Sequence, residues 1–254
     1  MSTNPQEGSR PTVVLVHGAF ADASSWNDVI ERLQAERVQV TAPPNPLRGI
    51  SIDSAYIGSF LDQIPGPVLA VAHSYGGAVI TNAATNANNV LGLVYVAAFA
   101  PDEGELLGAI ASRSKDSVVI PALIPLQYPT GEGQETAVEF RIDPEKFHEV
   151  FAFDLSEEQS ALMAATQRPL AESVFSEPTG VPAWKKLPSW AVVSTGDKVV
   201  GTDVVRSMAE RAGATITEVE GSHVIMISQP QIVAETILAA LAAAPRKEDV
   251  RAGR

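Results

Sequence analysis

A serine stands at the point where a strand-like pattern gives way to a helix-like one. Ser74 lies in the run Ala72-His73-Ser74-Tyr75-Gly76-Gly77, after the apolar residues 68–71 and before the helix-like stretch 78–84. Small residues two positions before and after the serine permit a sharp turn that exposes its hydroxyl. The free N–H groups of the following helix would face whatever that hydroxyl attacks. The pattern indicates a nucleophile. The alternative is a small-residue turn that only packs a helix on a sheet.

A serine hydroxyl needs a base within hydrogen-bond reach and a third group that orients the base. The chain has four histidines, of which His223 follows a strand-like run and precedes the last helix-like stretch. That position delivers a side chain to the active edge of a sheet, so His223 is the candidate base, with a helix cap as the alternative. We expect His73 to point away from the cleft and His148 to be solvated.

The acid should lie on another strand-end loop, between the serine and the histidine in the chain. Asp197, in Thr195-Gly196-Asp197-Lys198, fits this position and gives the order Ser, Asp, His. Asp102 ends an earlier strand-like run and is the rival candidate. A Gly-Asp pair is also favoured in turns, so the alternative is that Asp197 is a turn residue with no catalytic role.

A serine nucleophile also needs two preorganised donors for the oxyanion that forms in the reaction. One candidate is the backbone N–H of Tyr75, directly after the serine. The other is the N–H of Ala19, in the loop His17-Gly18-Ala19-Phe20 that follows the first strand-like run. Phe20 would then form a wall of the pocket. Taken alone, Gly18-Ala19 is also compatible with a plain tight exit from a strand.

The elements that must position these residues alternate between strand-like and helix-like patterns, which predicts an α/β fold with a parallel sheet. Buried strands in such a sheet read as nearly continuous apolar runs. The expected strands are 12–16, 38–41, 68–72, 91–97, 190–194 and 215–219, and the expected helices are 25–35, 52–64, 76–86, 203–212 and 230–243.

The alternation breaks over residues 101–186, which carry scattered aromatic residues and helix-like pieces such as 156–166. We expect a core of residues 1–100 and 187–244 and a cap, or lid, of residues 101–186 over the site, because the break follows the end of a strand. A merely structural subdomain is the alternative. The charged residues 245–254 are expected to form a disordered tail.

Composition narrows the classes of function. The 254 residues carry a net charge of −12, which argues against nucleic acid or an anionic membrane as partner. The absence of cysteine excludes disulfides, thiolate metal sites and a cysteine nucleophile. Together with a polar start of the chain it favours a cytoplasmic location. No run is long and apolar enough to span a bilayer.

These motifs, in this order, resemble the α/β-hydrolase superfamily over nearly the whole chain. The length, the HSYGG turn and the apolar residues 224–227 after His223 resemble the branch of plant methylesterases and hydroxynitrile lyases and its bacterial relatives. The resemblance implies about six mostly parallel strands with helices on both faces and an inserted cap, without the two leading strands of the family. The lyases of one plant lineage carry lysine and threonine where this chain has Val224 and Gly18, so the resemblance favours esterase chemistry. A serine in place of an aspartate nucleophile argues against dehalogenase and epoxide hydrolase activity.

The sequence thus predicts a serine hydrolase that cleaves an ester or lactone of a small, moderately hydrophobic molecule through an acyl-enzyme, with no metal or organic cofactor. The same triad could serve C–C bond cleavage, perhydrolysis or lyase chemistry, and a non-catalytic small-molecule receptor is the alternative of another class. The oligomeric state is left open. The candidate substrate pocket consists of Phe20, Phe99, Tyr128, Phe153 and Trp184, although large aromatic residues more often belong to the core.

Overall fold

Six parallel strands form the central sheet of the computed structural model, which describes residues 10–131 and 133–245. Their order across the sheet is β2-β1-β3-β4-β8-β9, and every neighbouring pair is parallel. The strands are β1 (Thr12–Val16), β2 (Gln39–Thr41), β3 (Val68–His73), β4 (Val90–Val96), β8 (Ser189–Ser194) and β9 (Thr215–Val219). The predicted α/β fold with six strands is therefore confirmed.

Burial explains why the central strands were readable from the sequence. Every residue of β3, β4 and β8 is buried, because helices cover both faces of the sheet. The edge strands β2 and β9 contain both polar and apolar residues and are partly exposed. Nearly continuous runs of apolar residues are thus found in the strands at the middle of the sheet.

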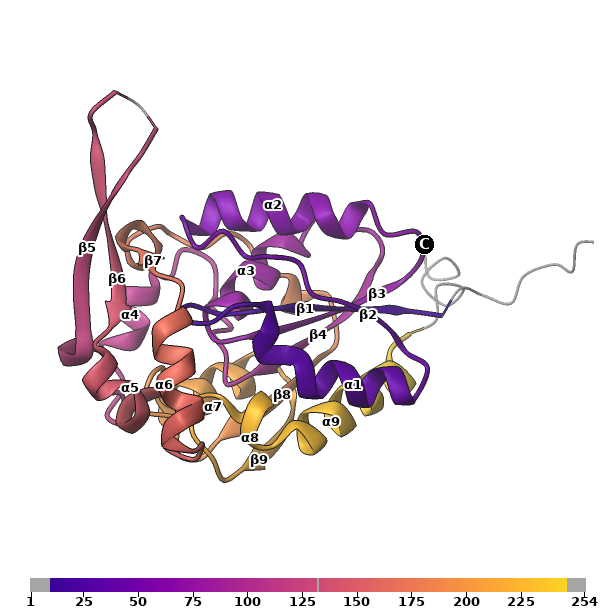
Figure 1. The fold of residues 1–254 in the computed structure, drawn as a ribbon. Helices are drawn as coiled ribbons and strands as arrows, with labels where there is room; N and C mark the ends of the chain where they lie inside the picture. The colour runs from indigo at the N-terminus through magenta and orange to yellow at the C-terminus, as the bar shows by residue number, and fades with distance from the viewer. Residues whose placement is uncertain (1–9, 132, 246–254) are drawn as a thin grey trace, which may run out of the picture.

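Helices lie on both faces of the sheet. In Figure 1, α2 and α3 lie above the sheet and pack against each other, and α1 and α9 form a pair below it. The helices of this part are α1 (Asn27–Ala35), α2 (Ile50–Asp62), α3 (Tyr75–Ala83), α7 (Thr202–Arg211), α8 (Ile225–Ser228) and α9 (Pro230–Ala243), with a 3-10 turn at Ala23–Trp26. No helix in the described ranges is both long and apolar enough to pass through a membrane.

The chain between β4 and β8 forms a separate set of elements at one end of the sheet (Figure 1). They include a three-stranded antiparallel sheet, of which the β5–β6 hairpin projects from the body. The elements are α4 (Leu107–Ala111), β5 (Leu123–Pro129), β6 (Thr136–Ile142), α5 (Pro144–Phe151), α6 (Glu157–Thr166) and β7 (Leu170–Ala171), with 3-10 turns at Ile120–Ala122, Glu172–Phe175 and Ala183–Lys185. The helix expected at 156–166 is present, whereas the hairpin had not been predicted. The tail expected at 245–254 lies, beyond Pro245, outside the described residues.

This inserted segment is tied to the loops at the C-terminal ends of β1 and β2. The guanidinium of Arg48 donates to Glu139 Oε2 of β6 at 2.7 Å and lies 4.4 Å from the ring centre of Tyr128 of β5. The Phe20 amide donates to the carbonyl of Arg168 at 3.0 Å. The segment therefore lies against the edge of the sheet where the candidate chemical residues were expected.

Candidate active site

Ser74 occupies a strained turn between β3 and α3. Its backbone has φ 53° and ψ −126°, a conformation that costs an ordinary residue about 1–3 kcal/mol and is found at functional sites. The two glycines that follow allow the close approach of neighbouring backbone. A Cβ at Gly76 would lie 2.7 Å from the carbonyl oxygen of Val16, and one at Gly77 would collide with the carbonyl oxygen of Phe99. The packing thus holds the serine in its unfavourable conformation.

His223 lies between Ser74 and Asp197. Its Nε2 is 2.8 Å from Ser74 Oγ, and its Nδ1 is 3.0 Å from Asp197 Oδ2. Asp197 and His223 are almost wholly buried, and only 5% of Ser74 is exposed. The loops after β3, β8 and β9 therefore bring the three sequence-predicted residues into one hydrogen-bonded series.

The surroundings of Asp197 aim one carboxylate oxygen at the histidine. Its Oδ1 accepts hydrogen bonds from the amides of Val199 at 2.8 Å and Val200 at 3.1 Å. The other oxygen is left for His223 Nδ1, which carries the proton when the ring is neutral. In that tautomer Nε2 is free to accept the hydroxyl proton of Ser74, as a general base must.

His73 also contacts this series, a role that the sequence had not suggested. Its Nε2 donates to the backbone carbonyl of His223 at 2.9 Å, and the two ring centres lie 4.6 Å apart. Burial, followed by the nearby His223, holds the pKa of His73 well below its usual value, so the ring is neutral. This hydrogen bond holds the backbone of the candidate base, His223. Adjacency to Ser74 was the only signal in the sequence.

The loop after β1 packs directly on the serine turn. A Cβ at Gly18 would lie 2.5 Å from Ser74 Cβ, so glycine is required for this contact. Among the described residues, the amides of Ala19 and Tyr75 donate to no other group, whereas the amide of Phe20 is engaged with Arg168. The two amides expected to bind an oxyanion are thus unoccupied and come from the two segments that meet at Ser74.

His17 shapes this loop and is not free to act as a base. Its Nδ1 donates to the carbonyl of Gly18 at 2.8 Å, and its Nε2 accepts from the amide of Asn45 at 2.9 Å. Burial is the main reason why the pKa of His17 is lowered. The hydrogen bond to the Gly18 carbonyl raises this pKa, and the charge of Arg168 lowers it. Both ring nitrogens of a neutral His17 are therefore committed to the backbone.

The five residues of the candidate pocket divide into two groups. Phe20 and Phe99 are buried next to the serine turn, and the Phe99 amide donates to the carbonyl of Ser74 at 3.1 Å. The other three contact residues outside the series. Tyr128 stacks on Arg48, Phe153 lies under Lys198 and against Gly196, and the Trp184 indole donates to the carbonyl of Pro101.

An aromatic residue that the sequence analysis did not select lies closer to the base. Phe151 of α5 is fully buried, and its ring centre lies 5.2 Å from that of His223 and 6.2 Å from that of Phe20. It thus bridges the candidate base and the loop after β1 from the inserted segment. Its spacing from Phe147 on α5 was a signal for a buried helix face but not for a site.

The rival acid is engaged elsewhere. Asp102 Oδ1 forms an ion pair with Lys185 Nζ at 2.5 Å, and the hydrogen bond from Lys185 is the main reason why its pKa is lowered. The charge of Lys185 is therefore balanced by Asp102.

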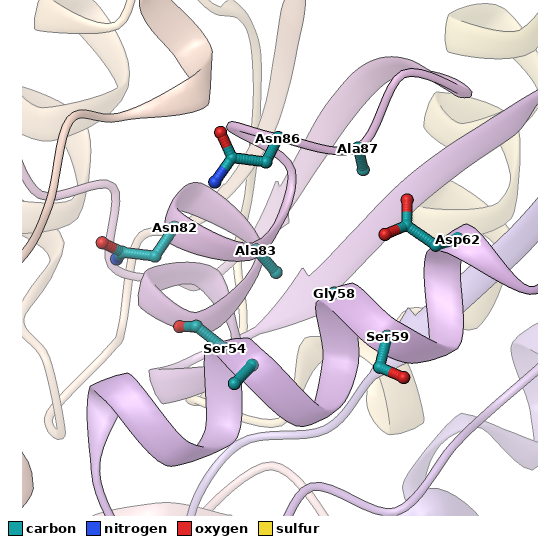
Figure 2. A pocket seen from close by; sticks show the side chains of 9 residues that line it. Ser54, Gly58, Ser59, Asp62, Asn82, Ala83, Asn86 and Ala87 are labelled. Carbon is teal, nitrogen blue, oxygen red and sulfur yellow. The ribbon is translucent and has the colours of Figure 1, made fainter.

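A groove of about 320 Å³ lies between α2 and the C-terminal half of α3 (Figure 2). It is lined by Ser54, Ala55, Gly58, Ser59, Asp62, Asn82, Ala83, Asn86 and Ala87. None of these residues belongs to the series around Ser74, and small and amide side chains dominate its walls. The groove is therefore separate from the candidate active site.

Comparison with known proteins identifies the family and the fold. A family model described as the alpha/beta hydrolase family matches residues 13–236. No curated protein matches the sequence. Among solved structures, polyneuridine aldehyde esterase superposes with a TM-score of 0.78 at 19% identity, over 91% of this chain and 99% of the other. A pyrethroid hydrolase from Sphingobium faniae JZ-2 superposes with a TM-score of 0.76 at 19% identity, over 92% and 98%.

A methylesterase from Arabidopsis superposes with a TM-score of 0.73 at 19% identity, over 91% of this chain and 99% of the other. At these identities the structural matches establish the fold, while the family model covers most of the chain. The resemblance stated from the sequence motifs is thereby confirmed, and its structural neighbours include plant methylesterases and other esterases. The chain belongs to the alpha/beta hydrolase family.

Proposed function

We propose that this protein is a carboxylic-ester or lactone hydrolase that works through a serine-bound acyl-enzyme. The observation that carries the proposal is the position of His223, with Nε2 2.8 Å from Ser74 Oγ and Nδ1 3.0 Å from Asp197 Oδ2. The esterases among its structural neighbours support the same class of reaction.

In the proposed mechanism Ser74 Oγ attacks the carbonyl carbon while His223 Nε2 takes its proton. The carboxylate of Asp197 stabilises the resulting imidazolium, and the amides of Ala19 and Tyr75 bind the oxyanion. His223 then returns the proton to the leaving alkoxide. It next activates a water molecule that attacks the acyl-enzyme, which releases the acid and regenerates Ser74.

The substrate in this proposal is uncharged and moderately hydrophobic. The ring of Phe151 supplies buried aromatic surface between His223 and Phe20, and the buried Phe99 contacts Ser74 through its backbone amide. Residues 101–186 act as the cap over a core of residues 1–100 and 187–244, and Phe151 is the cap residue that contacts the base. Tyr128, Phe153 and Trp184 belong to the outer part of the same cap region.

The test uses p-nitrophenyl esters of increasing acyl length together with a fluorophosphonate probe. Wild-type protein should hydrolyse at least one ester and become labelled at Ser74. The Ser74→Ala variant should lose both properties while keeping its circular dichroism spectrum, because removal of the hydroxyl leaves the fold unchanged. Ester turnover by Ser74→Ala at the wild-type rate would refute the proposed nucleophile.

A further inference from the structure

A buried carboxylate that the mechanism above does not use lies behind the serine turn. Asp53 of α2 has no exposed surface, and its Oδ2 accepts a hydrogen bond from the Tyr75 hydroxyl at 2.7 Å. Tyr75 is the residue directly after Ser74 and is itself 2% exposed. A charge in such a place is costly unless it is well paired, so the arrangement calls for an explanation.

The loop before α2 satisfies the rest of the carboxylate. The amide of Arg48 donates to the carboxylate and lies 3.1 Å from each of its oxygens. Leu47 adopts a left-handed conformation with φ 63°, which turns the loop toward the carboxylate. Asp53 is therefore a fixed acceptor, held by the backbone on one side and by one phenol on the other.

Tyr75 has two functional ends. Its backbone N–H is a candidate oxyanion donor, and its side chain reaches back to Asp53. The residue begins α3 directly after the strained backbone of Ser74. The carbonyl oxygen of the 74–75 peptide accepts from the amides of Gly77 at 3.0 Å and Phe99 at 3.1 Å, whereas its N–H donates to no group among the described residues. An anchor at the far end of the side chain restricts how far this peptide can rotate. Donors of an oxyanion hole act through such fixed orientation.

We propose that Asp53 is a positioning residue, which holds the Tyr75 amide in the orientation that stabilises the oxyanion by accepting a hydrogen bond from the Tyr75 hydroxyl. This role rests on the proposed function, since it concerns the same oxyanion. Asp53 touches neither the substrate nor the reacting atoms. Its effect should reach the reaction only through Tyr75.

The test compares Asp53→Asn, Tyr75→Phe and the double variant with wild-type protein. Loss of one oxyanion donor lowers kcat about 10²- to 10³-fold, so misalignment of a donor that is still present should lower kcat roughly 10-fold. KM should stay within about twofold, because neither side chain lines the pocket in this proposal. The double variant should be no slower than the slower single variant, because both substitutions break the same contact.

Tyr95→Phe is the matched control. The Tyr95 hydroxyl is also buried and is 2.8 Å from Thr81 Oγ1, which lies on the same helix α3 as Tyr75. This substitution removes a buried phenol hydroxyl from the neighbourhood of α3 without touching the serine turn. It should lower the melting temperature while leaving kcat at the wild-type value.

The second readout is the rate constant for labelling of Ser74 by a fluorophosphonate, which also develops negative charge on an oxygen. It separates the two proposals. If wild-type protein is labelled but hydrolyses no ester, the proposed function fails, and the labelling rates of the variants still decide the role of Asp53. Wild-type protein that is not labelled either would refute both proposals.

The role of Asp53 would be overturned if Asp53→Asn reacted at the wild-type rate. It would equally be overturned if Tyr75→Phe had no effect, or if the two effects multiplied in the double variant. If Asp53→Asn fails to fold, the comparison of Tyr75→Phe with Tyr95→Phe decides the question alone. A tenfold slower kcat and labelling rate only in Tyr75→Phe would support the anchor, and equal rates would refute it.

Discussion

The contact between Gly18 and Ser74 leads to a sharp prediction about the oxyanion loop. In Gly18→Ala the new Cβ would lie 2.5 Å from Ser74 Cβ and 2.9 Å from the carbonyl oxygen of His73. The first of these distances is about 0.9 Å shorter than the 3.4 Å at which ordinary contact begins, and neither neighbour is the mobile end of a side chain. The loop and the proposed nucleophile must therefore separate by about 0.5 Å to reach 3.0 Å and by nearly 1 Å to reach ordinary contact.

A displacement of this size should cost about 10²-fold in kcat/KM, because the reacting groups are positioned within a few tenths of an ångström. Overpacking of a buried contact should also lower the free energy of unfolding by about 1–3 kcal/mol. The assay is hydrolysis of a p-nitrophenyl ester, with active protein counted by fluorophosphonate titration and stability measured by urea unfolding.

Gly58→Ala is the control for the same chemical change. A Cβ at Gly58, in the middle of α2, would lie 3.6 Å from the nearest atom, the carbonyl oxygen of Ala83. This variant should keep its activity and gain about 0.5–1 kcal/mol of stability, because alanine is the better helix former. Wild-type kcat/KM in Gly18→Ala would refute the reading of residues 17–20 as an oxyanion loop packed on the nucleophile.

Two further predictions concern carboxylates. Asp197→Asn should lower kcat by about 10⁴-fold, as loss of the correct histidine tautomer does in serine proteases, whereas Asp102→Asn should leave kcat within about twofold; equal effects in an ester assay would contradict the assignment of the acid. Glu105 accepts two hydrogen bonds from Arg211, at 2.9 and 2.7 Å, and these are the main reason why its pKa is lowered below 4.5. A lowered folded pKa adds stability that is present above 4.5 and lost as the pH falls through the folded value. Glu105→Gln should therefore cost about 1 kcal/mol near neutral pH and progressively less in acid, as urea unfolding at several pH values would measure. A difference from wild type that did not shrink in acid would contradict this linkage.

The core of the fold was predictable because its signals are local. Runs such as 68–72 are apolar along their whole length, which is typical of strands covered on both faces. Parallel strands also carry their following loops to one edge of the sheet. The order of Ser74, Asp197 and His223 along the chain was thus enough to predict that the structure would bring them together.

The β5–β6 hairpin was not predicted because β5 lacks the pattern of a strand, although residues 138–142 of β6 alternate between apolar and polar side chains. Pro125 and Pro129 interrupt β5, several of its residues are exposed, and polar residues stand on both faces. β5 is supported by its pairing with β6, and the hairpin is held by the contacts of Arg48 with Glu139 and Tyr128. β6 follows β5 directly in the chain, but Arg48 lies 91 residues from Glu139, so no local window contains that contact.

The supporting residues of the site were missed for the same reason, and they share one physical property. His73 and Asp53 are buried polar groups whose partners lie 150 and 22 residues away. A sequence shows such residues only as polar positions in apolar surroundings, and it does not show what satisfies them. Had burial been known, each would have required a hydrogen-bond partner, but not a particular one.

The neutral state of His73 follows from its place beside the proposed base. In the proposed mechanism His223 becomes an imidazolium, and its ring centre lies 4.6 Å from that of His73. A second positive charge there would oppose proton transfer from Ser74, whereas a neutral His73 can donate from Nε2 to the carbonyl of His223 without that penalty. Burial is the main cause of its lowered pKa, so the apolar packing of β3 keeps the base able to accept a proton.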